Sequence, residues 1–261
     1  MLRKVIDVIP FWWMEFSCIS LLVILTLGAA YLSSRCFSIP NDKNQFDRSN
    51  TVLAILSGGF SVLLAFIIIT TWNTLLRAQD SAAQEANAVA VMMRNVEILP
   101  EKPRVKITKA LQDYAIAVRV KEWKSMKNGK ESPDAAGAVT ELYRAMQSFE
   151  PTTKIEQIYY QLALGNLNTI QKLRRDRINH LYSVIPERLS SALIVASISL
   201  ALIMGGVRGW SSFADLIPII IFAVVMGFNL AIAFAFDFPF SGDISVRNHF
   251  FYHGVLGAFK D

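Results

Sequence analysis

The sequence has little charge and few cysteines for its length. Only 18% of its 261 residues are charged, whereas about 25% is usual in a soluble domain. Two cysteines exclude a disulfide scaffold. Free thiols are expected, because one helix holding both Cys18 and Cys36 would keep them about 27 Å apart. The composition, with 53% hydrophobic residues, also excludes a disordered chain and a collagen-like fibre.

Patterns that carry chemistry are also missing. There is no glycine-rich phosphate loop, no nucleophile elbow and no zinc-binding spacing. His249 and His253 are four residues apart, but no cysteine or carboxylate pair accompanies them, so they are predicted to be interfacial residues of a C-terminal tail. The sequence shows no internal repeat, no low-complexity tract and no strand pattern. We therefore expect no enzyme activity, no metal and no cofactor.

What the sequence does have is four uncharged apolar blocks, at residues 16–34, 52–72, 189–207 and 216–236. Each block is close to the roughly 20 residues that cross the roughly 30 Å hydrocarbon layer as a helix. The first block is interpreted as a retained span, because it is longer than the core of a signal peptide and follows Trp12, Trp13 and Glu15. The sequence predicts an all-α integral membrane protein with four spans.

A polar, helix-forming segment of about 115 residues separates the second and third blocks. Residues 75–188 contain 18 Lys and Arg against 13 Asp and Glu, and their net charge of +5 equals that of the whole chain. The segment is predicted to continue the second span to Leu99 and then to form three helices, at about 104–127, 133–149 and 152–184. The predicted layout is 1–74 (first two spans), 75–188 (cytoplasmic helical domain), 189–237 (last two spans) and 238–261 (cytoplasmic tail).

Basic residues near the span ends predict the orientation. Arg3, Lys4, Arg77 and Arg188 fall on one side, together with the basic cluster of Lys172, Arg174, Arg175 and Arg177. The loops on the other side, about 35–50 and 208–215, hold few basic residues. Both termini and the helical domain are therefore expected to be cytoplasmic. Aromatic belts are expected at Trp12, Trp13 and Trp72 inside and at Tyr31 and Trp210 outside.

The second span carries a stripe with helical spacing. Its members are Ser57, Ser61, Leu64, Ile68 and Thr71, which fall on one side of a helix. Pointed at a common axis by several subunits, such a stripe would give polar mouths and an apolar constriction. The alternative is ordinary helix contact with hydroxyls bonded to their own backbone.

Three further features bear on function, and two of them have two interpretations each. Asn229, the only amide inside a span, is interpreted as a tie between helices or as part of a pathway. The glycine pairs at 58–59 and 205–206 are predicted to allow close helix packing. The basic cluster of residues 172–177 either attracts anionic lipid or forms a cationic vestibule that concentrates anions. Binding of nucleic acid is not expected, because the charges are interleaved with acids.

The segment that follows the fourth span resembles the close of a known family. Asp237, Pro239 and Gly242 stand in a stretch similar to the Asp-(Arg)-Pro-Phe-x-Gly segment of the bestrophin-like family of bacterial membrane proteins. Other pieces match in order over about residues 50–250, namely Glu85-Ala86-Asn87, Leu99-Pro100, Tyr114, Arg174–Arg177 and Pro186. Phe238 stands where the family pattern has Arg. Asp237, at the membrane boundary, is expected to find a basic partner such as Arg94 or Arg177.

This resemblance implies an architecture and a hypothesis. Bestrophins are pentameric ion channels with a hydrophobic neck on the second membrane helix, and Phe60, Leu64 and Ile68 look similar to that neck. The leading hypothesis is a homo-oligomeric ion channel of the bacterial inner membrane, with anions slightly favoured. Its partners would be membrane lipid, inorganic ions and further copies of the chain. The alternative is a non-conducting scaffold or signalling protein that binds a cytoplasmic partner.

Overall fold

The computed structural model describes residues 2–36, 43–210 and 213–259, and over these residues the chain is helical with no strand. The longer helices are α2 (Phe11–Cys36), α3 (Lys43–Val96), α4 (Glu101–Ile116), α6 (Pro133–Gln147), α7 (Lys154–Asn179), α8 (Glu187–Arg208) and α9 (Phe213–Ala235). The shorter ones are α1 (Leu2–Val8), η1 (Ala117–Glu122), α5 (Trp123–Lys127), η2 (Asn248–Tyr252) and η3 (Gly254–Ala258). Four of them, α2, α3, α8 and α9, are long and apolar enough to cross a membrane, as predicted.

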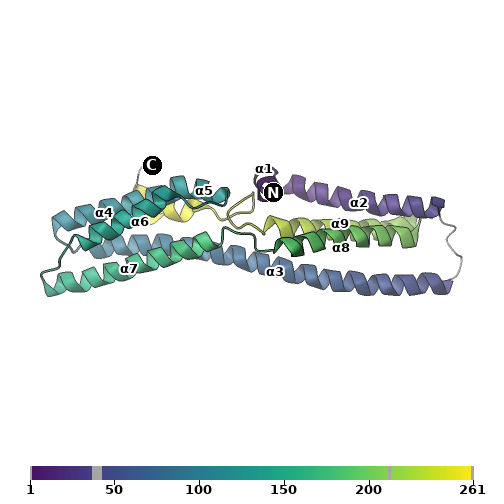
Figure 1. The fold of residues 1–261 in the computed structure, drawn as a ribbon, viewed down its shortest axis with the longest axis horizontal. Helices are drawn as coiled ribbons and strands as arrows, with labels where there is room; N and C mark the ends of the chain where they lie inside the picture. The colour runs from purple at the N-terminus through teal and green to yellow at the C-terminus, as the bar shows by residue number, and fades with distance from the viewer. Residues whose placement is uncertain (1, 37–42, 211–212, 260–261) are drawn as a thin grey trace.

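Helix α3 joins the two halves of the molecule. Its 54 residues extend about 80 Å at a rise of 1.5 Å per residue, and the helix runs along both the membrane bundle and the polar domain (Figure 1). The prediction that the second span continues without a break is confirmed, since a single helix runs to Val96. The physical reason is that no Gly or Pro lies between Thr70 and Val96. The helical domain is therefore tied rigidly to a membrane helix.

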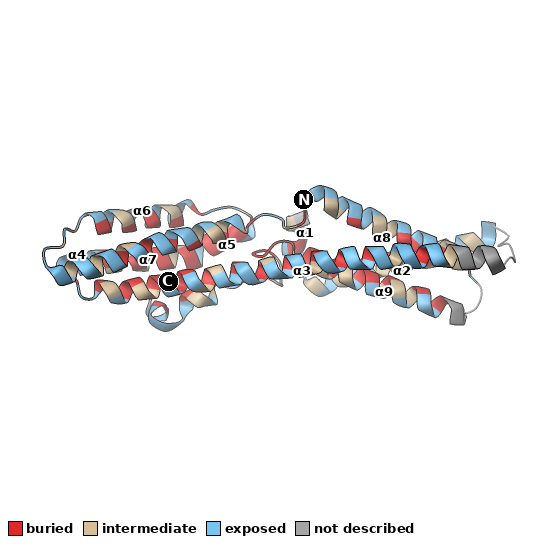
Figure 2. Ribbon diagram, turned by 90° about the horizontal axis from the view of Figure 1, so that it is seen from below, coloured by how far each residue is buried: buried red, intermediate tan, exposed pale blue. Residues whose placement is uncertain are grey.

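The membrane bundle places α2 and α3 on opposite sides of the α8–α9 pair (Figures 1 and 2). Helix α2 packs along both α8 and α9, whereas α3 makes fewer contacts with them. The core between them is apolar and includes Leu22, Leu64, Leu200 and Met226. One side of α3 consequently has no neighbour among the residues that the structure describes. Parts of the two predicted outer loops, residues 37–42 and 211–212, lie outside the described residues.

Glycine lets α2 approach its two neighbours closely. A Cβ added at Gly205 would lie 2.0 Å from the carbonyl oxygen of Thr26, and one at Gly227 would lie 2.8 Å from the Cα of Ile19. Gly206, Gly58 and Gly59 have nothing within 4 Å of such an atom. The prediction of close packing is confirmed for Gly205 and not for the other three.

Gly205→Ala is therefore expected to destabilise the membrane bundle by about 1–3 kcal/mol, because a methyl group would be forced against backbone. Gly206→Ala is the matched control and should be neutral or slightly stabilising, since alanine favours a helix by about 1 kcal/mol over glycine. Thermal unfolding of the two purified variants in detergent measures the difference. Equal melting temperatures would contradict the close α2–α8 contact.

The helical domain is built around the second half of α3. Helix α7 packs along it, α4 packs on it less extensively, and α6 packs on α4. The predicted helix 104–127 is interrupted by a π-helical turn at Ala117–Glu122, which no periodicity indicated. Two buried charged residues, Arg119 and Glu122, lie in this turn. The wide turn directs these two side chains to different partners: Arg119 contacts the C-terminal tail and Glu122 contacts α7.

The C-terminal tail is part of this core. Phe240, Val246, Phe251 and Leu256 are buried in the same apolar cluster as α3, α4 and α7. Arg119 donates hydrogen bonds to the carbonyl oxygens of Leu256 and Phe259 at 3.2 and 2.6 Å, and the Trp123 indole N–H donates to Val246 at 3.1 Å. The tail predicted as a separate segment is thus held by the helical domain.

Candidate functional site

The sequence-predicted stripe on α3 faces the protein's own helices. Phe60, Leu64 and Thr71 are buried, with 8%, 3% and 1% of their surfaces exposed. Ser57 and Ile68 are partly exposed and Ser61 is exposed. The Ser61 and Thr71 hydroxyls donate to the carbonyls one turn earlier, Ser57 at 2.8 Å and Ile67 at 3.0 Å. Phe60, Leu64 and Thr71 are thus covered by their own protomer, and the pore lining expected of them stays a prediction.

The open side of α3 carries a second stripe. We call it the open face of α3; its members within the span are Ile55, Gly59, Val62, Phe66 and Ile69, all exposed. Phe66 exposes 65% of its surface and Ile55 69%. The stripe continues below the span at Asn73, Arg77 and Asp80, which are also exposed. An uncharged apolar face thus ends in polar side chains where α3 leaves the membrane bundle.

A small cavity of about 190 Å³ lies between α3 and α9 at the edge of the predicted stripe. Its lining brings Phe60, Ser61, Leu64 and Ile68 together with Asn229. The Asn229 amide has no hydrogen-bond partner among the described residues, so the interpretation of Asn229 as a tie between helices finds no support within one chain. Unpaired polar groups at membrane depth are costly, and this half-buried amide is open to a partner from outside the protomer.

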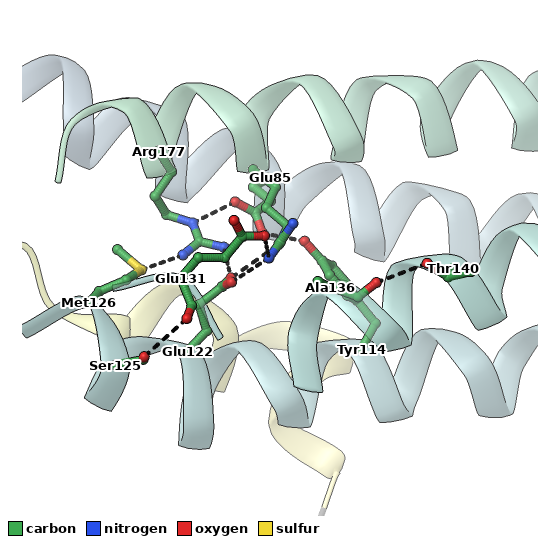
Figure 3. A network of polar contacts seen from close by, with 10 residues as sticks. Glu85, Tyr114, Glu122, Ser125, Met126, Glu131, Ala136, Thr140 and Arg177 are labelled. Carbon is green, nitrogen blue, oxygen red and sulfur yellow. Dashed lines mark hydrogen bonds and ion pairs between the residues drawn. The ribbon is translucent and has the colours of Figure 1, made fainter. Parts of the chain in front are cut away.

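A buried network of charges links three helical segments of the helical domain (Figure 3). Arg177 of α7 is fully buried and forms two parallel hydrogen bonds to Glu85 of α3, at 2.7 and 2.9 Å. It also contacts Glu122 of η1 at 2.7 Å. Tyr114 donates its hydroxyl proton to Glu85 at 2.6 Å. Every oxygen of the buried Glu85 carboxylate therefore has a donor.

The network extends toward the surface through Arg174. This side chain contacts Glu122 at 2.6 Å and Glu131 at 2.8 Å. Burial lowers the pKa of Arg177, but Glu85 and Glu122 outweigh that effect and hold its pKa above the ordinary value. Burial and the adjacent Glu85 carboxylate hold the pKa of Tyr114 well above its ordinary value. Arg177 is consequently always charged, and Tyr114 is always a donor.

These contacts divide the basic cluster into two buried and two exposed residues. Arg177 is fully buried and Arg174 exposes only 12% of its side chain, so both charges are neutralised inside the helical domain. Lys172 and Arg175 are exposed on the same helix and remain free to meet lipid or ions. A run of basic residues on one helix therefore serves two purposes, because alternate sides of α7 face the core and the solvent.

Asp237 forms a second buried centre, at the junction of membrane bundle and helical domain. It is fully buried, and its carboxylate accepts hydrogen bonds from the Ser183 hydroxyl at 2.8 Å and the Ile185 backbone N–H at 2.7 Å. The Val184 N–H donates to the Asp237 carbonyl at 3.1 Å. Asp237 thus fixes the loop between α7 and α8, and this loop explains why α7 ends at Asn179 rather than near residue 184.

The basic partner expected for Asp237 is neither Arg94 nor Arg177. Arg94 is exposed and Arg177 pairs with Glu85. The positive charge near Asp237 comes from Arg3 of α1, whose guanidinium carbon lies 4.7 Å from the ring centre of Phe238. An arginine from the N-terminus therefore lies over the position at which the family pattern has its own arginine.

Helix α1 is docked on the same segment. Gly242 has a backbone φ of +85°, and a Cβ there would lie 2.8 Å from the Ile6 side chain, so glycine is required at this turn. The Asp243 carboxylate accepts the Phe11 N–H at the start of α2, at 2.8 Å. The Pro239 carbonyl accepts the Val246 N–H at 2.8 Å. The segment 237–243 consequently joins α1, α2, α8, α9 and the tail.

In the described part of the chain no three His, Cys, Asp or Glu side chains are grouped to hold a metal ion. His249 and His253 have ring centres 5.8 Å apart, but His253 lies beyond the short helix η2. What the arrangement offers is a rigid coupling between a membrane helix and a helical domain.

Sequence reasoning missed the pairing of Glu85, Glu122 and Arg177, although it had singled out two of the three positions. The carboxylates come from segments 92 and 55 residues away from Arg177 along the chain, and spacing carries no information at such separations. The one available signal was an uncompensated charge, because Glu85 interrupts an alanine-rich side of α3 that reads as core.

Comparison with known proteins agrees with the architecture. No curated protein and no solved structure matches the chain. The family model described as the Bestrophin-like domain matches residues 20–251, which contain the four apolar helices apart from the first turns of α2, the buried network and the Asp237 segment. Since this match covers most of the chain, the protein belongs to the bestrophin-like family.

Proposed function

We propose that the protein is an oligomeric ion channel in which the open face of α3 surrounds the axis. The observation that carries this proposal is the position of α3, which lies at the edge of the bundle and presents an uncharged face with no neighbour in the described part of the chain. Membership of the bestrophin-like family supports the same assignment. In a symmetric ring of such protomers, that face is available to line a path.

The chemistry of the open face supports gating by dewetting. Val62, Phe66 and Ile69 would form an apolar constriction, since a narrow apolar passage expels water and blocks ions. Asn73 would form a polar ring below it. A neighbouring protomer would meet the cavity between α3 and α9, which is lined by Ser61 and Ile68 of α3 and by Asn229 of α9.

The helical domain would form the vestibule. Because α3 runs unbroken into this domain, the same helices that line the membrane path would border the aqueous entrance. Lys172 and Arg175 keep their positive charges exposed, and the segment 75–188 carries a net charge of +5. This excess favours anions at the entrance. The preference is slight, because Arg174 and Arg177 are neutralised by carboxylates.

The remaining parts of the proposal follow the distribution of basic residues. Both termini and the helical domain would lie in the cytoplasm of a bacterium, with the spans in the inner membrane. The proposed assembly is a homo-oligomer, a pentamer by resemblance to bestrophins. The large exposed apolar side chains of α3 would meet other copies or the axis.

The proposal is tested by flux from liposomes that contain the purified protein. Phe66→Ala is expected to raise chloride flux on the order of tenfold, because each subunit would lose apolar surface from the constriction and the barrier to wetting would fall. The matched control is Ile24→Ala, whose side chain is equally exposed at 66% but lies on α2, across the α8–α9 pair from α3. Its flux should equal that of the unmodified protein.

Two results would contradict the proposal. Absence of flux from well-folded protein in liposomes would exclude conduction. A response to Leu64→Ala with none to Phe66→Ala would show that the opposite side of α3 faces the path. Counting subunits by mass in detergent gives a separate check, since a monomer has no axis for α3 to line.

A second candidate is a non-conducting scaffold. Ile155, Ile158 and Leu162 expose 62%, 51% and 50% of their surfaces along one side of α7. Such a row on a helical domain is typical of a surface that binds another protein helix. An oligomer without flux, combined with loss of assembly when these three residues are changed to serine, would favour this candidate.

A further inference from the structure

A polar groove lies at the point where α3 leaves the membrane bundle. It encloses about 330 Å³ between α3 and the last turn of α7 and is lined by Arg77, Asp80, Ser81, Asp176, Asn179 and His180. Neither the buried network nor the proposed ion path uses this enclosed space. Its composition is mixed, with one cationic side chain, two carboxylates and three neutral polar groups, so it is unlike the apolar cavities of the membrane bundle.

The depth of the groove matches the headgroup layer of a membrane. The apolar side of α3 ends at Trp72 and Leu76, both exposed, and Arg77 is the next residue. From Arg77 to Ser81 the helix advances about 6 Å. The headgroup layer of a bilayer is about 5–8 Å thick on each side, from the roughly 30 Å core and the roughly 40–45 Å total. The α8 span begins at Glu187, seven residues after His180, which places the α7 side of the groove at the same boundary.

The charges in the groove are separated and only partly used. Within the described residues no carboxylate lies within ion-pair distance of Arg77. Asp80 accepts a hydrogen bond from the Gln84 amide at 2.7 Å and keeps further acceptor positions. Burial lowers the pKa of His180, and the nearby Arg77 lowers it further against the opposing effect of Asp176. His180 is therefore neutral at pH 7, and the groove carries one positive and two negative charges.

We propose that this groove binds the headgroup of a zwitterionic phospholipid whose amine is a primary ammonium. Arg77 would donate hydrogen bonds to the phosphate, for which a guanidinium is suited. Asp80 and Asp176 would accept from the ammonium, and the acyl chains would extend from the groove toward the membrane bundle. A purely anionic headgroup meets two carboxylates there and is disfavoured.

This inference goes beyond the proposed function and does not depend on conduction. The probes are phosphatidylethanolamine, phosphatidylcholine and phosphatidylglycerol with identical acyl chains, added to the delipidated full-length protein in detergent. Retention of each lipid is measured by native mass spectrometry. Phosphatidylethanolamine is expected to be retained about fivefold better than phosphatidylglycerol, a ratio that corresponds to one net charge near the surface. Phosphatidylcholine, which has no ammonium N–H, should fall between them.

Variants locate the effect. Asp80→Asn with Asp176→Asn should remove the fivefold preference, and Arg77→Gln should weaken retention of all three lipids. The control is Glu97→Gln with Asp113→Asn, which removes two carboxylates from a groove at the far end of the helical domain and should leave the preference unchanged. Melting temperatures without lipid should be the same for all variants, because these side chains are at the surface.

Three outcomes would overturn the proposal. They are equal or stronger retention of phosphatidylglycerol by the unmodified protein, an equal loss of preference in the control variant, and full competition by soluble glycerophosphoethanolamine. The last result would assign the groove to a soluble amine phosphate rather than to a membrane lipid.

Discussion

Arg177→Gln is expected to lower the melting temperature of the helical domain on the order of 10 °C. Breaking a buried ion pair by removing one partner costs about 3–5 kcal/mol, because the other charge stays buried without compensation. In a chain of this size each kcal/mol shifts the midpoint by about 2–4 °C. Thermal unfolding of the full-length protein in detergent, followed by circular dichroism, measures the change.

In this variant Glu85 is the buried group that would lose its only charged partner. Its carboxylate has two partners, Arg177 and Tyr114, and only Arg177 is charged. Glu122 would keep its contact with Arg174 at 2.6 Å. The loss would therefore appear mainly as separation of α7 from α3, since the Glu85–Arg177 pair joins these two helices. The guanidinium also lies 5.1 Å from the ring centre of Trp123, a contact that glutamine does not restore.

A double variant separates the charge effect from packing. Arg177→Met with Glu85→Gln removes both charges and leaves an amide oxygen at position 85 that still accepts the Tyr114 hydroxyl proton. Replacing a buried ion pair by neutral groups of similar size is often tolerated, so this variant should recover most of the stability that Arg177→Met loses alone. Lys172→Gln, on the exposed side of α7, is the matched control and should shift the midpoint by no more than about 2 °C.

A contrary result is easily recognised. If the double variant were as unstable as Arg177→Met alone, the effect would come from lost packing around Trp123 and Met126. The ion pair itself would then contribute little to the joint between α3 and α7.

Local chemistry explains what the sequence predicted well. The four spans follow from uncharged runs, and the unbroken α3 follows from the absence of Gly and Pro after Thr70. The three helices predicted after Leu99 begin within three residues of their expected starts, and Thr153 forms a complete capping box with Glu156. Each of these depends on residues within about one or two turns, which is the range over which sequence patterns determine structure.

The orientation of α3 could not be predicted in the same way. In its span both sides of the helix are apolar, so hydrophobicity does not distinguish the side that packs on α8 and α9 from the side left open. The hydroxyls of Ser61 and Thr71 suggested a polar path, but both bond to their own backbone. A hydroxyl in a membrane helix is satisfied locally and is therefore a weak marker of an aqueous surface.

The partners of residues far apart in the sequence could not be predicted either. Arg3 lies beside Phe238 across almost the whole chain, and Arg119 binds carbonyls of the tail more than 130 residues away. These contacts depend on how α1 and the tail fold back onto the junction. The motif at residues 237–242 was found because it is contiguous, while the groups that complete it came only with the structure.

The second large effect concerns Asp237. Asp237→Ala is expected to destabilise the protein by about 1–3 kcal/mol, because it leaves the buried Ile185 N–H without an acceptor. The exposed Ser183 hydroxyl contributes less, since it also donates to the Ile185 carbonyl at 2.7 Å. Asp237→Asn keeps an oxygen in place for Ile185 and should lose much less. Melting temperatures at pH 7 distinguish the two variants, which differ by one polar group at the same position.

The pH dependence gives an independent readout. Burial raises the pKa of Asp237 above its ordinary value, against the opposing effects of the Ile185 and Ser183 hydrogen bonds and the Arg3 charge. Between the unfolded and the folded pKa, the folded protein therefore still holds a proton that the unfolded chain has released. The contribution of this carboxyl to stability falls as the pH rises through that range. Asparagine does not titrate. The stability of Asp237→Asn relative to the unmodified protein should consequently increase between about pH 4 and pH 7.

The opposite trend would have a definite structural meaning. If Asp237→Asn lost stability relative to the unmodified protein as the pH rose, the ionised carboxylate would be favoured by folding, and Arg3 would outweigh burial. Arg3→Gln combined with Asp237→Asn then decides the matter by a double-mutant cycle. Because Arg3 lies on α1 and Asp237 at the end of α9, a strong coupling between them would show that the N-terminal helix is needed to hold the membrane bundle on the helical domain.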